Sequence, residues 1–340
     1  MARAIGKKRI EINSSAQPNS NPHLGTVTTL FCVFALAQRL QSETGLATHV
    51  VFDYLENARA SLEVIGGKAY QHSLSSARTS DGQPLYSEFL PEFERLLSFA
   101  AERSGISFRM RSYDEFQQDA VVRKLLLRCM TLGETLRPLL APNERHLHIR
   151  FPCPACGLIE KACDTLTVED GDPDCMVLRM ICPHHGPHSR ELSVGGRHYF
   201  DTGTSVRDVV KVAALGIQAE KEGALSVMLD GSDWGGAWAW NISALGATHL
   251  GSKYAELPVR YFSPAILDAT GSKFSKSVFV ASNTYDYLPR ELLDSASMHA
   301  LHGDAIFERL WKEVLAWVSS PARFFRNYSI EYMVDRMYGA

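Results

Sequence analysis

The stretch that decides the fold runs from residue 9 to residue 54 and reads RIEINSSAQPNSNPHLGTVTTLFCVFALAQRLQSETGLATHVVFDY. Its first residues, 9–14, alternate and predict a strand that leads into a Pro-, Asn- and Ser-rich turn. Residues 23–43 are periodically apolar and lack proline, which predicts a helix ended by Gly45. Residues 48–54 resemble a buried parallel strand. This order of strand, loop, helix and strand predicts the first half of a nucleotide-binding sheet.

The remaining sequence predicts a second half of the sheet and several additions. Helices are expected over 88–104, 114–132, 206–222 and 238–245, strands over 225–230 and 259–267, and an amphipathic helical tail over 285–338. The Gly- and Ser-rich residues 66–84 predict a mobile loop. We expect an α/β protein with a Rossmann-like parallel sheet, an inserted zinc-ribbon-like module and a short C-terminal helical region.

Four regions are expected along the chain. The first half of the catalytic domain with a helical connector spans 1–149, and a Cys-, Pro- and His-rich inserted module spans 150–200. The second half of the catalytic domain spans 201–280, and the helical region spans 281–340.

Composition excludes few functions. The chain has 340 residues, 45% of them hydrophobic and 21% charged, with a net charge of −3. These values are ordinary for a soluble globular protein, and the charge does not favour a nucleic-acid partner. No apolar run approaches the ~18 residues of a membrane span, and no signal peptide is apparent. We therefore expect a cytoplasmic protein without a membrane partner, and nothing in the sequence sets its oligomeric state.

The segment Pro18 to Thr26, PNSNPHLGT, is the first candidate phosphate-binding element. A nucleotide at a parallel sheet lies beyond the strand ends, against a helix N-terminus. Asn19 lies in the turn, and Gly25 permits a close backbone approach because it has no Cβ. His23 offers an imidazole donor, and Thr26 offers a hydroxyl. The alternative is an Asn/Pro turn before an ordinary helix.

The second candidate element is KFSKS, residues 273–277. The ammonium groups of Lys273 and Lys276 can neutralise a triphosphate and follow its charge onto departing pyrophosphate. Ser275 and Ser277 offer hydroxyls to phosphate oxygens, with Phe274 between the charged residues. The alternative is a solvated basic loop.

The two elements resemble the HIGH and KMSKS signatures of class I aminoacyl-tRNA synthetases. Thr26 stands where the family has its second histidine, and Phe274 stands at its methionine. The resemblance covers residues 9–62 and 204–280. The sequence around residues 14–19 and 52–57 is most similar to arginyl enzymes, and the cysteine-rich insertion is most similar to class I lysyl enzymes.

The resemblance implies roles for residues between the two elements. Gly231 and Asp233 resemble the Gly-x-Asp element that binds the ATP ribose, for which a surface turn is the alternative. The amino-acid pocket is expected to use seven residues: Ser14, Asp53, Tyr54, Asn57, Trp234, Trp238 and Asn241. For the two tryptophans, packing in the protein core is the alternative. Asp53 is expected to pair with a substrate ammonium, and a cationic amino acid is suggested by analogy.

Paired cysteines and histidines predict a structural zinc site. Cys153 and Cys156 form one two-residue-gap pair, and Cys182 and His185 form the other. His188 replaces His185 as the fourth ligand if the spacing after Cys182 is wider, and His184 is a weaker candidate for the same position. Reduced buried cysteines in a loop-rich insertion are the alternative.

The expected function is ATP-dependent activation of an amino acid or other carboxylate to an acyl-adenylate, with Mg²⁺ shielding the phosphates. Only 63 residues follow Ser277, fewer than a full anticodon-binding domain requires. The expected acceptor is therefore a small amine, a peptide or a carrier. The alternatives are a compact enzyme that charges tRNA through its acceptor end, and an inactive paralog that acts as a binding protein.

Overall fold

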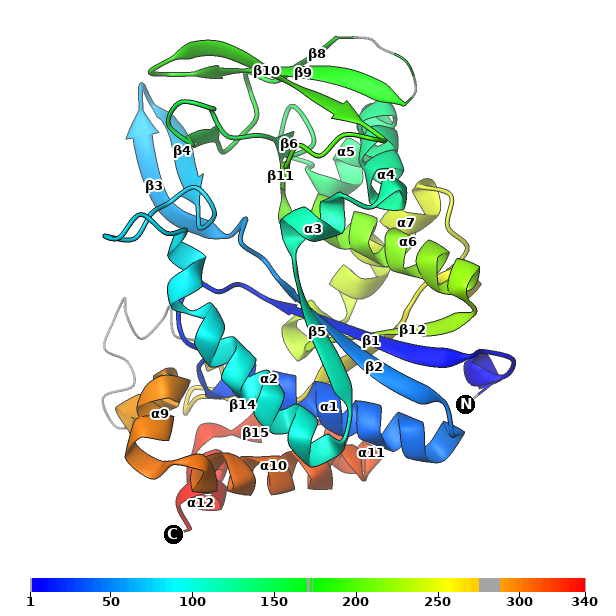
Figure 1. Ribbon diagram of the computed structural model, residues 1–340, viewed down its shortest axis with the longest axis vertical. Coiled ribbons are helices and arrows are strands. Elements are labelled where there is room, and N and C mark those ends of the chain that lie inside the picture. Colours follow the sequence, from blue (N-terminus) through cyan, green and yellow to red (C-terminus); the bar gives the residue numbers. More distant parts are fainter. Residues whose placement is uncertain (1, 170–171, 173, 275–287, 340) are drawn as a thin grey trace.

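A five-stranded parallel sheet forms the centre of the protein (Figure 1). The computed structural model describes residues 2–169, 172, 174–274 and 288–339. The sheet has the order β13-β12-β1-β2-β5, in which every neighbouring pair is parallel. Its strands are β1 (Arg9–Ala16), β2 (Ala47–Tyr54), β5 (Ser107–Ser112), β12 (Ala224–Gly231) and β13 (Val259–Ser263). This is the doubly wound order of nucleotide-binding sheets, so the predicted fold class is confirmed.

Two helical layers cover the sheet. On one face lie α1 (Leu24–Thr44), α2 (Leu90–Ser104) and α10 (Asp304–Val318), and their apolar side chains form one core with Ile10, Val50 and Phe52. On the other face lie α4 (Ala120–Thr131) and α6 (Thr204–Glu222), which belong to a second core. The shorter helices are α3 (Tyr113–Gln117), α5 (Gly133–Leu140), α7 (Leu245–His249), α9 (Ser295–His302), α11 (Pro321–Phe324) and α12 (Ile330–Tyr338).

Helix α1 begins and ends at residues that favour those positions. The Nδ1 atom of His23 accepts a hydrogen bond from the backbone N–H of Gly25, which satisfies one of the free donors of the first turn. Gly45 closes the helix in the left-handed region at φ 71°, where glycine carries no steric penalty. The turn before His23 therefore meets the helix N-terminus beside the ends of β1 and β2, as the sequence predicts.

The inserted module is a small antiparallel sheet on top of the second core (Figure 1). It contains β8 (Thr167–Glu169), β9 (Cys175–Cys182) and β10 (Gly186–Ser193). Leu178, Met180 and Leu192 belong to the same buried cluster as α4 and α6, so the module packs onto the helical layer that these two helices form.

Several sequence-based predictions of secondary structure need correction. The loop predicted over 66–84 is wrong for residues 68–73, because β3 (Arg59–Ile65) and β4 (Lys68–Ser73) form a hairpin that β7 (Ile159–Glu160) extends. The helix predicted over 114–132 is divided into α3 and α4. The strand predicted over 259–267 is β13 followed by β14 (Ile266–Leu267), which pairs with β15 (Tyr328–Ser329). The remaining pair is β6 (Ile149–Arg150) with β11 (Asp201–Thr202).

The predicted C-terminal helical region packs on α1 and holds the turn before it. The backbone N–H of Ser295 donates to the carbonyl of Pro22 at 2.8 Å, and the Asn21 amide contacts the Asp294 carboxylate at 3.2 Å. Among the residues that the structure describes, no helix is long and apolar enough to cross a membrane.

Candidate functional site

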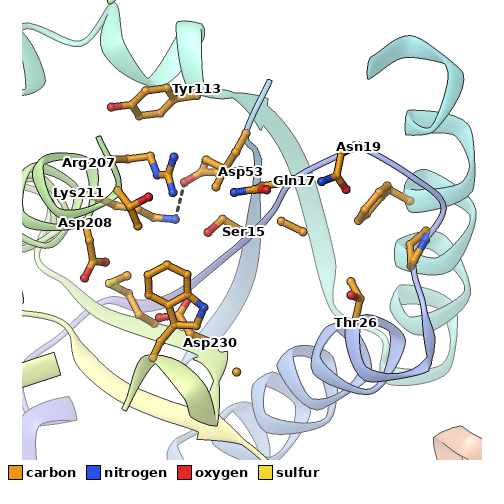
Figure 2. Close-up of a pocket in the computed structure, with 18 of the residues that line it drawn as sticks. Ser15, Gln17, Asn19, Thr26, Asp53, Tyr113, Arg207, Asp208, Lys211 and Asp230 are labelled. Atoms are coloured by element: carbon orange, nitrogen blue, oxygen red, sulfur yellow. Dashed lines mark ion pairs between the residues drawn. The ribbon is translucent and has the colours of Figure 1, made fainter. Parts of the chain in front are cut away.

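A cavity of about 690 Å³ opens at the carboxyl ends of β1, β2 and β12. Strand order reverses between β1 and β12, and ligands of doubly wound sheets bind in the crevice at such a point. One side of the cavity is formed by the turn before α1 and the other by α6 (Figure 2). The volume is within the range of natural ligand pockets.

The first predicted element lines this cavity. Asn19, His23 and Thr26 are all lining residues, and Figure 2 shows Asn19 and Thr26 on the side formed by α1 and its preceding turn. A Cβ on Gly25 would lie 3.0 Å from the His23 ring, so glycine lets the imidazole cap the helix. The helix N-terminus and these side chains together form a surface suited to phosphate oxygens.

Two other predicted elements meet at the same cavity. The Nζ atom of Lys273 lies 2.8 Å from a carboxylate oxygen of Asp233, and both side chains are partly exposed. A Cβ on Gly231 would approach Asp233 Oδ1 to 2.5 Å, so glycine gives that carboxylate its space. Gly231 and Lys273 also line the cavity. Phe274 is buried, with its ring 5.9 Å from that of His23. Ser275, Lys276 and Ser277 lie outside the described residues.

Helix α6 contributes charged residues that the sequence analysis did not identify. Arg207, Asp208 and Lys211 all line the cavity, and Figure 2 shows Arg207 and Lys211 projecting from the helix toward Asp53. Arg207 and Lys211 are four residues apart and therefore share one face of the helix. The sequence did contain a signal for these residues. Lys211 interrupts the apolar run VVKVAALG, residues 209–216, and Arg207 lies two residues before that run.

Asp53 is engaged by cations of the protein itself. Its carboxylate lies 2.7 Å from Arg111 Nε and 3.0 Å from Lys211 Nζ, and the Asn13 amide donates to it at 3.1 Å. Burial favours the neutral acid, but Lys211 and Arg111 outweigh it, so the pKa of Asp53 lies below its ordinary value. Asp53 is ionised and holds Lys211 in the cavity wall.

A second ion cluster forms a neighbouring part of the wall. Arg260 donates to Asp230 at 2.9 Å and lies 3.4 Å from Asp208. Asp208 also accepts from the indole N–H of Trp238 at 2.8 Å and from the hydroxyl of Ser243. Burial raises the pKa of Asp230 above its ordinary value, although Arg260 acts against this shift. This cluster has two carboxylates for one guanidinium.

The predicted substrate residues divide into two groups. Asp53 and Trp234 line the cavity, whereas the other five do not: Ser14, Tyr54, Asn57, Trp238 and Asn241. Ser14 is buried within β1, Tyr54 contacts the Tyr86 ring, and Asn241 is exposed.

The two tryptophans do not share a regular helix as expected. Trp234 ends a short turn, and Trp238 begins a π-helical segment, Trp238–Ala244, beyond two glycines. Their rings still meet edge to face, with centroids 5.3 Å apart. Trp238 therefore supports the wall from behind, both through Trp234 and through its hydrogen bond to Asp208.

The four predicted zinc ligands come together in the inserted module. One ligand atom from each of Cys153, Cys156, Cys182 and His185 lies within 4.8 Å of the others. The Sγ atoms of Cys156 and Cys182 are 3.7 Å apart, and His185 Nδ1 lies 3.6 Å from Cys182 Sγ. Three thiolates and one imidazole suit tetrahedral Zn²⁺, and four protein ligands leave no open position.

The geometry distinguishes between the candidate histidines. His185 belongs to the cluster, whereas His188 and His184 do not. His188 lies on β10 with its ring against that of Phe151, at a centroid distance of 5.2 Å.

Comparisons with known proteins show similarity in structure alone. No family model matches the sequence, and no curated protein matches it. Solved structures do match. A methionyl-tRNA synthetase of Mycobacterium tuberculosis in complex with methionyl-adenylate aligns over 97% of this chain and 68% of its own, at 14% identity and a TM-score of 0.48.

Two further solved structures also match over most of this chain at low sequence identity. A glutamate-tRNA ligase of Elizabethkingia meningosepticum, in complex with its amino acid, aligns over 81% of this chain and 53% of its own, at 11% identity and a TM-score of 0.37. A protein of Campylobacter jejuni described as an arginyl-tRNA synthetase aligns over 96% and 66%, at 9% identity and a TM-score of 0.38. The chain thus spans about half to two thirds of the length of these proteins.

Proposed function

We propose that the protein activates a carboxylic acid with ATP, forming an acyl-adenylate and pyrophosphate. The observation that carries the proposal is the ion pair of 2.8 Å between Lys273 and Asp233 at the edge of the cavity. It brings a candidate phosphate-binding loop to a candidate ribose-binding carboxylate, beside the helix N-terminus formed at His23. Three separate stretches of sequence therefore meet around one crevice suited to a nucleotide.

In this mechanism a carboxylate oxygen of the acid attacks the α-phosphorus in line. The new bond joins the acyl oxygen to phosphorus, while the bond from the α-phosphorus to the α,β-bridging oxygen breaks. Its electron pair leaves with pyrophosphate. No covalent protein nucleophile is required, because positioning and charge stabilisation provide the acceleration.

The residues of the chain have distinct tasks in this proposal. The N–H groups at the start of α1, with Thr26 and His23, bind phosphate oxygens. Asp233 accepts hydrogen bonds from the ribose, and Lys273 stabilises the leaving pyrophosphate. Mg²⁺, when bound with ATP, neutralises further phosphate charge. Zn²⁺ held by the three cysteines and His185 stabilises the inserted module and takes no part in the reaction.

The acyl group then passes to a second nucleophile. We propose a small amine, a peptide or a carrier, and the acceptor end of a tRNA is the competing possibility. The acid is activated before the acceptor reacts, so the two half-reactions can be measured separately.

The test is ATP–pyrophosphate exchange with the full chain and a panel of amino acids and other carboxylates, with and without total tRNA. Acid-dependent exchange without tRNA supports adenylation. Transfer of the acyl group to tRNA would assign the acceptor as tRNA. If no acid supports exchange in either condition, the proposed function is wrong, and a role as a binding protein replaces it.

A further inference from the structure

Arg207 is a buried cation at the wall of the candidate site. It lies on α6, its exposed fraction is 8%, and it lines the cavity. Figure 2 shows it near Tyr113, on the side of the cavity away from Thr26 and the start of α1. It therefore lies at the end of the cavity away from the first candidate phosphate-binding element.

The protein gives Arg207 little compensation for its charge. Its Nη1 atom contacts the Asn57 side-chain oxygen at 3.4 Å. The Asn57 amide nitrogen in turn donates to Asp201, and that carboxylate is paired with Arg150 at 2.8 Å. Within the described part of the chain, Arg207 forms no ion pair with a carboxylate. A buried charge without an opposite charge is costly, so an unpaired guanidinium facing a cavity favours an anionic ligand.

The other cations of the cavity differ from Arg207 in this respect. Lys211 pairs with Asp53, Arg260 with Asp230, and Lys273 with Asp233. Asp53 is also shared with Arg111, which lies behind the wall. Positive charge is therefore in excess where Arg207 and Lys211 face the cavity, and a cationic side chain would be repelled there.

Negative charge is in excess at a neighbouring part of the wall. Asp208 and Asp230 share a single guanidinium, that of Arg260. This part of the wall suits a substrate ammonium, whereas Asp53, the residue that the sequence suggested for that role, is already neutralised. The cavity thus presents an anion-binding end and a cation-binding patch in one enclosure.

We infer that the activated acid is an acidic amino acid whose second carboxylate binds Arg207. The inference rests on the proposed function, because it identifies the substrate of the same site. Arg207 presents a planar fork that can bind a carboxylate with two parallel hydrogen bonds. Asn57 is a positioning residue, since it orients the guanidinium and does not line the cavity. The reactive carboxylate then lies toward the ATP end.

The experiment compares three groups of acids in ATP–pyrophosphate exchange: acidic amino acids of increasing length, neutral amino acids, and cationic amino acids. Dicarboxylates without an amino group test the patch at Asp208 and Asp230. Each group is measured with the wild type, Arg207→Gln, Arg207→Lys and the control Arg190→Gln. Arg190 is a partly buried arginine whose guanidinium lies over the Phe151 ring. Within the described residues it forms no ion pair with a carboxylate, and it lies outside the cavity.

The wild type is expected to prefer an acidic amino acid. Arg207→Gln should lower kcat/KM for that acid by about 10- to 100-fold, the usual effect of losing a charged hydrogen-bond partner. The kcat/KM of Arg207→Lys should lie between those of the wild type and Arg207→Gln, because lysine keeps the positive charge but cannot form two parallel hydrogen bonds. Arg190→Gln should match the wild type.

Two results would overturn the inference and leave the proposed function intact. One is exchange supported only by neutral or cationic acids. The other is exchange with an acidic amino acid that is unchanged in both Arg207 variants. If no acid supports exchange, the proposed function fails, and the shift in Tm caused by glutamate or its homologues decides the inference. A shift present in the wild type and lost in Arg207→Gln supports an acidic-ligand site, and no shift refutes it.

Discussion

Within the described part of the chain, Lys273 is the residue of the proposed phosphate-binding element 273–277 that lines the cavity. Lys273→Ala should lower the rate of ATP–pyrophosphate exchange by about 10²–10³, the usual effect of removing one group that stabilises developing charge. The Tm should change little, because the pair with Asp233 is partly exposed and such pairs contribute at most about 1 kcal/mol.

The matched control is Lys253→Ala, which removes an exposed lysine paired with Glu256 outside the cavity. Exchange in the Lys253 variant should equal that of the wild type. Equal rates in the Lys273 variant and the wild type would remove Lys273 from the mechanism.

Glu56 gives the molecule a pH-dependent element of stability. Its carboxylate is buried and accepts hydrogen bonds from the N–H groups of Tyr113 and Asp114, at 2.8 and 2.7 Å. Burial raises its pKa from 4.5 to about 7, in spite of these hydrogen bonds. Between these two pH values the folded protein holds a proton that the unfolded chain has lost. The contribution of Glu56 to stability is therefore complete below pH 4.5 and decreases as the pH rises toward 7.

Urea unfolding at pH 5 and pH 8 measures this effect in the wild type and in Glu56→Gln, which cannot ionise. As the pH is raised from 5 to 8, the free energy of unfolding of Glu56→Gln should increase relative to that of the wild type, by up to about 3 kcal/mol. A difference between the two proteins that is the same at both pH values would show that Glu56 titrates normally.

The proposed zinc site is expected to stabilise the inserted module that contains β8 to β10. Cys182→Ser removes one of the four proposed zinc ligands, so the purified variant should contain little zinc. Its Tm should also fall, because Leu178 and Leu192 of the module belong to the core shared with α6. Metal analysis and thermal unfolding measure the two effects.

Cys175→Ser is the control for this prediction. Cys175 begins β9 and does not belong to the cluster, so its replacement should leave the zinc content unchanged. Equal zinc content in the Cys182 and Cys175 variants would contradict the assignment of the site.

Sequence patterns predicted the elements that carry a strong local signal. The β1-α1-β2 unit was found because a turn, a helix cap and a buried strand follow one another in order. The edge strand β5 was missed because it is only six residues long and mostly not buried, so SFRMRS contains just two apolar residues. The hairpin of β3 and β4 was missed for the same reason, since most of β3 is exposed.

In the candidate site, too, the residues with a strong local sequence signal were predicted and the others were missed. Sequence motifs are the reason that His23, Gly231 and Lys273 could be predicted to lie around one site, and all three line the cavity. Arg207 and Lys211 could not, because their role depends on the packing of α6 across the strand ends. The pairing of Asp53 with Arg111 likewise depends on β2 and β5 being neighbours, and β5 was not predicted.

At the scale of the whole molecule, the C-terminal helices complete the core beneath the sheet. Trp317 of α10 is fully buried, stacks on Tyr328 at a centroid distance of 4.3 Å, and donates to Glu313 at 2.8 Å. Trp317→Ala should reduce the free energy of unfolding by about 3–5 kcal/mol, as large-to-small core substitutions do. Exchange activity should be lost at lower temperature, because this region also holds Pro22 and Asn21.

Urea unfolding at 25 °C measures this prediction, and Trp317→Phe is the control. The phenyl ring keeps most of the packing and loses the hydrogen bond, so its effect should be clearly smaller. Equal stability of the alanine variant and the wild type would show that the C-terminal helices are not part of the main core.

The central claim is that a carboxylate attacks the α-phosphorus of ATP in this cavity. The most direct test uses an acid labelled with ¹⁸O in its carboxylate, with hydroxylamine to trap the activated acyl group. Adenylation predicts one ¹⁸O atom in the AMP that is released, together with unlabelled pyrophosphate. Label in orthophosphate accompanied by ADP would instead show attack at the γ-phosphorus, and would contradict the account.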